Sequence, residues 1–423
     1  MNFIPRLPLA LSFTVLTLHL SCSQGAAAPS GVEPSEQVAS TSPSVQLGPR
    51  PFFLAERLPE GALRDRLLSC TGPFATDRFS IGHRGAPLQF PEHTEESYRA
   101  AARMGAGILE CDVTFTSDRE LVCRHSQCDL HTTTDILRRP ELAAKCRVPF
   151  QPADPESGTP ATAECCTSDI RLEEFKSLCG KMDGFNPLAS TVDEFLNGTP
   201  SWRTDLYTTC GTLLTHRESL KLFQELDVAV TPELKSPMVE MPYQGDFTQA
   251  AYATALIREL EEAGVPPSDA YPQSFNPADI EHWIQAHPTY GEQAIFLDGR
   301  SRSNLDPNDS TTWVPTMEDL VSRGVRTLAP PIWMLATATD SQFQPTAYGK
   351  AARAAGLNLV TWTLERSGQP SLKEDWYYFG LGPAMHSEGQ VFALLDMLDR
   401  ELDVVGVFSD WPATTTFFAN CSD

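Results

Sequence analysis

The sequence has few basic residues for its length and no long uninterrupted hydrophobic segment. Its 423 residues include 32 Lys and Arg against 55 Asp and Glu, which gives a formal charge of −23. A surface of this sign repels nucleic acid and anionic membranes at long range, so we expect neither as a partner. An anionic small molecule would be repelled as well unless its site reverses the field locally, and a bound metal ion is one direct means of doing so.

The first 28 residues have the pattern of a secretory signal peptide. Arg6 is the only charged side chain before an apolar run from Leu7 to Leu20. Small residues follow that run up to Ala28, as they do at a cleavage site. Because the run is short and is interrupted by Pro8 and His19, it does not suit a bilayer span, and we expect no stable membrane insertion.

These features predict a secreted, extracellular protein. The triplet that ends at Cys22 leaves open a periplasmic protein or one anchored by a lipid on Cys22, although His19 fits that motif poorly. Residues 29–50 are rich in Ser and Pro without an apolar period, which predicts a flexible linker. A globular domain over 51–423 would follow, and the 41% hydrophobic content is sufficient for a sizeable core.

Short apolar segments alternate with helical stretches over this domain. The predicted strands are 79–83, 107–115, 120–125, 228–233, 271–275, 294–297, 326–329, 358–364 and 403–408. The predicted helices are 94–104, 247–263, 277–287, 317–323 and 348–355. Such alternation predicts a parallel sheet covered by helices. No G-x-G-x-x-G motif follows the first strand, which argues against a dinucleotide-binding fold.

One of these strands does not fit a parallel arrangement. Only four residues separate Phe115 from Glu120, whereas a parallel crossover needs about a dozen or more. The strand over 120–125 must therefore return antiparallel, as a β-hairpin after the second strand. The remaining strands suit a closed (β/α)₈ TIM barrel of the α/β class, and an open doubly wound sheet is the alternative.

The segment from about 135 to 215 interrupts the alternation between the hairpin and the next barrel strand. It is irregular, rich in Pro and Gly, and holds five of the 11 cysteines. No C-x₂-C pair occurs, and ten cysteines remain when Cys22 is set aside, so in an exported chain we predict disulfide bonds. We expect them to staple this insertion and not the strands that carry the candidate site. The insertion either forms part of a pocket at the barrel mouth or decorates the surface. In a secreted chain, the N-x-S/T triplets at Asn197, Asn308 and Asn420 also permit glycosylation.

Polar residues that suit phosphate chemistry lie at the ends of the predicted strands. His83 and Arg84 close the first strand in a glycine-flanked turn, and Arg presents a planar fork of donors that matches phosphate oxygens. A second histidine, His125, returns on the hairpin. Glu233 and Lys235 follow a later strand and face the same way. Taken alone, each cluster also fits an ordinary satisfied or surface-exposed polar group.

Two carboxylates, Glu110 and Asp112, lie in a mostly apolar strand and project from the same face. Facing inward, they would repel each other and lose solvation unless a hard divalent cation such as Ca²⁺ or Mg²⁺ bound there, with Glu233 as a third ligand. Alternatively the carboxylates face solvent, and Cys111 and Leu109 face inward. With the two histidines, the inward arrangement would suit phosphodiester hydrolysis, one ring acting as base and the other as acid.

The candidate residues belong to a longer series of motifs. The series is His83-Arg84-Gly85, Pro91-Glu92-His93-Thr94, Glu110-x-Asp112, His125 with Leu130-His131-Thr132-Thr133-Thr134, Glu233-Leu234-Lys235, Gln273-Ser274-Phe275-Asn276-Pro277, Trp362-Thr363 and Ser409-Asp410-Trp411-Pro412. In this order, over roughly 79–412, the sequence resembles glycerophosphodiester phosphodiesterases. The resemblance implies a (β/α)₈ barrel and hydrolysis of a small-molecule glycerophosphodiester to glycerol 3-phosphate and an alcohol.

The resemblance also implies a role for each candidate residue. The acid–base pair would be His83 and His125, the substrate-binding residues Arg84, Lys235 and Trp362, and the ligands of a Ca²⁺ or Mg²⁺ cofactor Glu110, Asp112 and Glu233. A glycerol hydroxyl of the substrate would attack phosphorus, and water would then open the resulting cyclic phosphate.

Two positions depart from the family pattern. His93 stands where Asn is usual, and Ser126 stands where an Asp usually follows the second histidine. Neither is assigned to acid–base or metal duty, but a missing carboxylate beside His125 could alter the orientation of that ring or the affinity for the metal.

Two rival functions remain open at this stage. One is a sphingomyelinase D-like enzyme that cleaves lysophospholipids, since such enzymes share the two histidines and three carboxylates. The long insertion and the intact Glu233-Leu234-Lys235 favour the glycerophosphodiesterase. The other is a catalytically silent barrel with a binding role, against which the complete set of polar residues argues.

Overall fold

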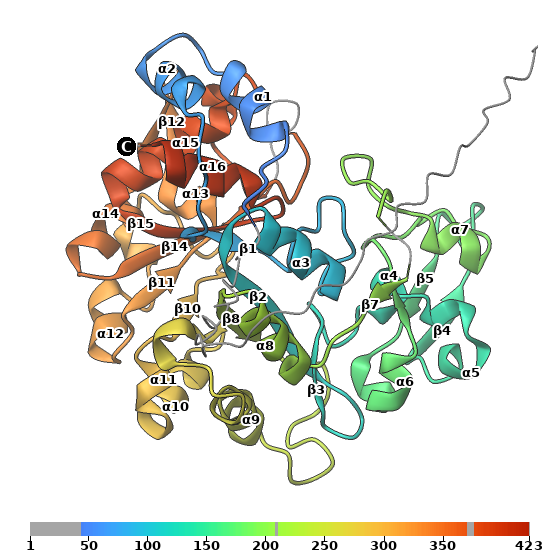
Figure 1. The fold of residues 1–423 in the computed structure, drawn as a ribbon. Coiled ribbons are helices and arrows are strands. Elements are labelled where there is room, and N and C mark those ends of the chain that lie inside the picture. Colours follow the sequence, from blue (N-terminus) through green and yellow to red (C-terminus); the bar gives the residue numbers. More distant parts are fainter. Residues whose placement is uncertain (1–43, 208–209, 370–375, 423) are drawn as a thin grey trace, which may run out of the picture. The chain divides into compact units, whose positions relative to one another are not determined.

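Eight parallel strands form a closed barrel in the computed structural model, which describes residues 44–207, 210–369 and 376–422 (Figure 1). The strands are β1 (Asp77–Gly82), β2 (Ala106–Phe115), β8 (Ala229–Leu234), β9 (Gln273–Ser274), β10 (Ile295–Leu297), β11 (Thr327–Ala329), β14 (Asn358–Leu364) and β15 (Val404–Ser409). Each pairs with the next, and β1 pairs with both β15 and β2, which closes the ring. The predicted (β/α)₈ barrel is therefore confirmed.

The strand β3 (Leu121–Cys123) does not belong to the ring. It pairs antiparallel with β2, and Leu121 lies opposite Phe115. The predicted hairpin is confirmed, because the short turn between the strands leaves no room for a parallel crossover.

Helices follow most barrel strands and cover the outside of the ring. They are α3 (Glu95–Arg103), α8 (His216–Glu225), α9 (Gln249–Glu262), α10 (Pro277–Ala286), α11 (Pro288–Gly291), α12 (Met317–Ser322), α13 (Ile332–Leu335), α14 (Ala347–Ala354), α15 (Gln390–Leu402) and α16 (Ala413–Cys421). Several begin at a side-chain cap: the hydroxyl of Thr94 accepts from the Ser97 N–H, and that of Thr248 accepts from the Ala251 N–H. Such caps satisfy backbone donors that the first turn leaves unpaired.

The packed domain begins earlier than the sequence predicted. Leu47, inside the predicted linker, is buried, and the Gln46 N–H donates to the Arg103 carbonyl over 2.8 Å. Two further helices, α1 (Arg50–Glu56) and α2 (Ala62–Ser69), precede β1. The linker prediction is therefore wrong for residues 44–50, because apolar side chains there pack on the core. The predicted signal peptide, Cys22 and the rest of the predicted linker lie outside the described residues.

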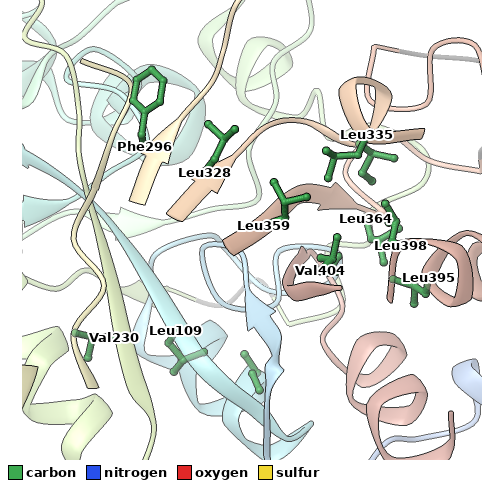
Figure 2. Close-up of a cluster of buried hydrophobic side chains, with 14 of the residues drawn as sticks. Leu109, Val230, Phe296, Leu328, Leu335, Leu359, Leu364, Leu395, Leu398 and Val404 are labelled. Atoms are coloured by element: carbon green, nitrogen blue, oxygen red, sulfur yellow. The ribbon is translucent and has the colours of Figure 1, made fainter. Parts of the chain in front are cut away.

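The barrel strands are buried on both faces, as expected for a parallel sheet under helices. The interior holds an apolar cluster of Ile81, Ile108, Ala229, Ile295, Leu297, Ala329, Val360 and Phe408. The outer face packs against the helices, and Figure 2 shows part of this layer, including Leu109, Val230, Phe296, Leu328, Leu359, Leu395 and Leu398. Burying each Leu or Phe contributes about 1.5–3 kcal/mol, so this two-sided core holds the strand ends in place.

The predicted insertion is a separately cored segment between β3 and α8. Its regular elements are α4 (Leu130–Thr133), α5 (Pro140–Ala143), β4 (Val148–Gln151), β5 (Thr162–Glu164), α6 (Leu172–Lys176), β6 (Cys179–Gly180), α7 (Val192–Leu196) and β7 (Gly211–Thr212). Its core includes Phe175, Phe195 and Ile170. Elsewhere β12 (Ala336–Thr339) and β13 (Gln342–Pro345) form a small hairpin, and short 3₁₀ turns lie at Ile136–Arg138, Thr167–Asp169, Pro267–Asp269, Ser310–Thr312 and Gly382–Ala384.

Ten cysteines form five disulfide bonds. The pairs are Cys70–Cys421, Cys111–Cys123, Cys128–Cys166, Cys146–Cys165 and Cys179–Cys210. Three of them hold the insertion, as predicted. The expectation that no bridge would involve the site strands is wrong, because Cys111 on β2 is bonded to Cys123 on β3. Cys111 alternates with the inward carboxylates, so its side chain lies on the outer face of β2.

Among the residues that the structure describes, no helix is both long enough and apolar enough to cross a membrane.

Candidate active site

A cavity of about 80 Å³ lies at the end of the barrel where the strands finish. Its lining residues are His83, Arg84, Glu110, His125, Glu233, Lys235, Phe275, Leu297, Trp362, Thr363, Tyr377 and Phe408. Seven of the eight site residues predicted from the sequence are in this set. The eighth, Asp112, is buried beside them, with Oδ1 3.8 Å from Nζ of Lys235. The structure thus brings all eight together at the carboxyl ends of parallel strands, where barrel active sites are found.

The three predicted metal ligands adjoin one another on two neighbouring strands. In the register of β2 and β8, Asp112 lies opposite Glu233, and Glu110 precedes Asp112 by two positions on the same inward face. One carboxylate oxygen from each of the three lies within 4.8 Å of the others. The alternative arrangement, in which the carboxylates face solvent and Cys111 faces inward, is therefore wrong.

Protonation differs among these carboxyl groups. Burial raises the pKa of Glu233 to about 8, and burial together with the charge of Asp112 raises the pKa of Glu110 well above its usual range. Burial acts in the same direction on Asp112, but Lys235 and His93 outweigh it and hold its pKa well below the usual value. Three buried carboxyl groups so close together remain protonated in part unless positive charge is added.

The donor set fits a hard divalent cation. Oδ1 of Asp112 is buried and accepts no hydrogen bond from the described residues, so one oxygen of the trio is left for a ligand. Carboxylate oxygens are the ligands that Ca²⁺ and Mg²⁺ prefer, and both ions complete their shells with water or substrate oxygens. Gln273 restrains one of the three carboxyl groups, since its Nε2 donates to Oε1 of Glu110 over 2.9 Å.

His83 follows β1 and is held by Asp410, which follows β15. Nδ1 of His83 lies 2.6 Å from Oδ1 of Asp410. Burial would raise the pKa of Asp410, but Arg366 and His83 lower it to about 2, so the carboxylate is ionised and can only accept. The proton of the ring therefore lies on Nδ1, and Nε2 is the acceptor, 3.9 Å from Oε2 of Glu110. Burial, helped by the charge of Arg84, lowers the pKa of His83 to about 4.

His125 enters the same cavity from the segment after β3. Burial lowers its pKa well below the usual value, and the charges of Arg84 and Lys235 act in the same direction. An anion beside those two cations would oppose this effect and favour the protonated ring.

The two basic side chains of the cavity, Lys235 and Arg84, each form an ion pair with a neighbouring glutamate. Nζ of Lys235 lies 2.6 Å from Oε1 of Glu233, and Nη1 of Arg84 lies 3.1 Å from Oε1 of Glu92. The Arg84 N–H also donates to Oε2 of Glu110 over 3.0 Å. The turn requires Gly85, which has φ +94° and lies so close to Ser97 that a Cβ would be 2.4 Å from its Oγ.

Aromatic rings form one wall of the cavity. Trp362 on β14 packs edge-to-face with Phe275 at 5.7 Å and with Tyr377 at 6.1 Å between ring centroids. Its Nε1–H donates to the Ala329 carbonyl over 2.8 Å, which fixes the indole. Only Trp362 of these rings was predicted as a substrate contact.

The two departures from the family pattern have different positions. His93 is buried, and its ring joins Oδ2 of Asp112 and the Tyr98 hydroxyl, each at 2.8 Å. The Ser126 N–H donates to Oδ2 of Asp129 over 2.9 Å, so a carboxylate contacts the backbone of the residue that follows His125. Sequence reasoning assigned no role to Glu92, Gln273 or Asp410, and it left His93 either to donate to the phosphate or to pack, although the quoted motifs contain all four.

The insertion reaches this region. Nη2 of Arg203, an insertion residue, lies 3.6 Å from Oδ2 of Asp410. The insertion thus contacts the barrel beside the cavity, although none of its described residues lines the cavity itself.

Comparison with known families identifies the barrel. The model of the glycerophosphoryl diester phosphodiesterase family matches residues 83–414. The chain belongs to this family. A glycerophosphodiester phosphodiesterase of Arabidopsis thaliana, GDPD6, is 34% identical over 76 residues, which are 18% of this chain and 20% of that protein. A longer match, 41% identical over 245 residues, covers 57% of this chain and 99% of a protein of Arthroderma benhamiae named "Extracellular protein".

A solved structure supports the fold of this family member. A crystal structure from Silicibacter pomeroyi, whose name places it in the same family, has a TM-score of 0.52 and 18% sequence identity. The likeness covers 82% of this chain and 95% of that one.

Proposed function

We propose that this protein hydrolyses glycerophosphodiesters to glycerol 3-phosphate and an alcohol, with His83 and His125 as the acid–base pair. Family membership supports the reaction class. The observation that carries the proposal is the gathering of two histidines, three carboxylates, an arginine and a lysine around one cavity.

His83 suits the role of general base. Its Nδ1–H is committed to Asp410, so the lone pair of Nε2 is available to take a proton from an attacking hydroxyl. Its lowered pKa keeps the ring neutral at pH 7. The attacking oxygen then forms the new bond to phosphorus as the proton passes to His83.

His125 suits the role of general acid. The bound phosphate would raise its pKa by offsetting Arg84 and Lys235, and the protonated ring would give its proton to the departing alkoxide. If attack comes from a hydroxyl of the substrate, the two rings exchange roles when water opens the cyclic phosphate. Each ring then returns to its starting state.

Glu110, Asp112 and Glu233 would hold Ca²⁺ or Mg²⁺, which supplies positive charge to phosphoryl oxygens when bound. Arg84 and Lys235 would contact the phosphate from the same side of the cavity, and Trp362 would pack against the substrate. In a protein with a formal charge of −23, this local positive charge is what permits an anionic substrate to bind.

We also propose that the protein is secreted. The ten paired cysteines are typical of an oxidising compartment, and the relative from Arthroderma benhamiae is named as extracellular.

A substrate panel tests the function. The purified protein is assayed for release of alcohol from glycerophosphocholine, glycerophosphoethanolamine and glycerophosphoinositol, and from sphingomyelin and a lysophospholipid, each with Ca²⁺, Mg²⁺ or EDTA. We expect cation-dependent turnover of the glycerophosphodiesters. Turnover of sphingomyelin alone would favour a sphingomyelinase D-like reaction, and no turnover of any substrate would favour a silent barrel. Glu110→Gln is the matched inactive control.

A further inference from the structure

The carboxylate of Asp410 is shared between one histidine and two arginines. While Oδ1 lies 2.6 Å from Nδ1 of His83, Oδ2 lies 3.3 Å from Nη1 of Arg366 and 3.6 Å from Nη2 of Arg203. The Asp410 side chain is fully buried, and the side chains of Arg203 and Arg366 are 4% and 10% exposed. The group that orients His83 is thus itself held through its other oxygen.

A second carboxylate links the two arginines. Oδ2 of Asp183 lies 3.7 Å from Nη1 of Arg203 and 3.5 Å from Nη2 of Arg366. Asp183 and Arg203 both lie within the loop that the Cys179–Cys210 disulfide closes, whereas Arg366 and Asp410 follow barrel strands. The network therefore joins the insertion to the barrel.

The residues on both sides of Arg203 are anchored to barrel loops. Nε1 of Trp202 donates to the Arg366 carbonyl over 3.3 Å, and the Thr204 N–H donates to the Leu88 carbonyl over 3.3 Å. The ring of Tyr207 stacks on that of Phe90, with centroids 4.5 Å apart. These contacts fix the backbone that presents the guanidinium to Asp410.

Burial distinguishes Arg203 from its neighbours. Four other arginines of the insertion form ion pairs with side chains that stay 34–68% exposed: Arg138, Arg139, Arg147 and Arg171. Burying Arg203 beside Arg366 places two like charges together in a region of low dielectric, which is costly unless both meet carboxylates. An insertion that only covered the surface would not need a buried arginine. An insertion that holds the buried carboxylate of Asp410 in place does.

We infer that Arg203 is a positioning residue for His83: the disulfide-closed loop of the insertion delivers its guanidinium to Asp410, and Asp410 in turn fixes the ring of His83 in its Nδ1–H form. The inference rests on the base role proposed for His83. Partners that orient metal-ligating side chains typically change affinity or activity by about 10–100-fold when removed, and we expect an effect of the same order for a partner that orients a general base. Arg366 remains on Asp410 when Arg203 is lost, so the lower end of that range applies.

The kinetic test compares Arg203→Gln, Arg203→Lys and the matched surface variant Arg138→Gln. We expect Arg203→Gln to lower kcat about tenfold with KM within about twofold, since no contact with the substrate is removed. Arg203→Lys keeps the positive charge but lacks the planar guanidinium with its paired donors, so its kcat should lie between those of Arg203→Gln and the wild type. Arg138→Gln should match the wild type. A kcat for Arg203→Gln within twofold of the wild type, or an equal loss in Arg138→Gln, overturns the inference.

A spectroscopic test is independent of turnover. In protein labelled with ¹⁵N-histidine, the ring shifts of His83, assigned with His83→Asn, report which nitrogen carries the proton. We expect the Nδ1–H form in the wild type and a loss of that preference in Arg203→Gln and, in smaller measure, Arg203→Lys. An unchanged tautomer in both variants overturns the role of Arg203. If the wild type turns over no substrate, the proposed function fails, and the ring shifts alone decide whether Arg203 positions His83.

Discussion

His93 and Asp112 are joined by a hydrogen bond of 2.8 Å from Nε2 of the ring to Oδ2 of the carboxylate. Burial lowers the pKa of His93 to about 4 even though Asp112 opposes this, so the ring is neutral and its Nε2–H donates to the ionised Asp112. The Tyr98 hydroxyl can then donate to Nδ1. The histidine that departs from the family pattern thus fixes one predicted metal ligand in place.

Two substitutions of His93 should show whether its hydrogen bond to Asp112 or only its packing matters for metal binding. Asn can still donate to Asp112, so His93→Asn should keep metal affinity and kcat within about threefold. His93→Leu leaves Oδ2 of Asp112 without that donor and should weaken metal affinity by about 10–100-fold. Calorimetric titration with Ca²⁺ and with Mg²⁺ measures both variants. Equal affinities for the Leu variant and the wild type would show that His93 only packs.

The two histidines proposed as the acid–base pair should act as one unit. His83→Ala or His125→Ala should lower kcat by at least about 10²-fold, the usual scale for a lost general acid or base. Substrate binding should suffer less, because Arg84, Lys235 and the metal would still hold the phosphate. The double variant should be little slower than the slower single variant. Steady-state kinetics of the three variants test this, and a near wild-type kcat in either single variant would refute the assignment.

Removal of the metal should abolish activity, and metal binding should depend on pH in a defined direction. Burial raises the pKa of Glu233 to about 8, so below pH 8 a cation must displace a proton. The apparent affinity for Ca²⁺ or Mg²⁺ should therefore rise with pH, by up to about tenfold per unit for each proton displaced. Titrations at pH 6, 7, 8 and 9 check this. An affinity independent of pH, or full activity in verified metal-free protein, contradicts it.

The disulfides should contribute unequally to stability. Cys70–Cys421 joins residues 351 apart in sequence, and Cys111–Cys123 joins residues 12 apart. Loop-closure entropy predicts about 3 kcal/mol for a loop of about 15 residues and more than about 4.7 kcal/mol for one above about 100 residues. Replacing both cysteines of each pair by Ala should thus lower the free energy of unfolding more for Cys70–Cys421. Denaturant unfolding measures the difference, and the reverse order would point to native-state strain or residual structure as the dominant effect.

The insertion should lose stability in mild acid through His131. The Cys165 N–H donates to Nδ1 of His131 over 3.3 Å, and burial lowers the pKa of the ring to about 4. In the unfolded chain the ring protonates near pH 6.5, so between pH 6.5 and 4 the unfolded state binds a proton that the folded state does not. The free energy of unfolding should therefore decrease as the pH is lowered from 6.5 to 4, and this decrease should be smaller in His131→Asn. His287→Asn, outside the insertion, serves as the control for replacing a histidine.

Local patterns sufficed to predict the barrel. The alternation of apolar segments and capped helices, and the short turn after Phe115, are consequences of backbone geometry over a few residues. The same holds for the inward pair, since the two-residue period of a strand puts Glu110 and Asp112 on one face. Helix α8 was missed although its capping box, Thr215 with Glu218, was readable in the sequence.

The sequence by itself determined the barrel, its hairpin and the residues at the strand ends, because those depend on short-range periodicity and on motifs of a few residues. Only the tertiary structure decided which face of β2 points into the barrel, that Cys111 bonds to Cys123, and that Asp410 and Arg203 lie behind His83. Arg203 and Asp410 lie far from His83 in the chain, and no local rule couples their positions. Closure of the barrel and packing of the stapled insertion bring the three together, since contacts between distant segments form only when the whole core folds.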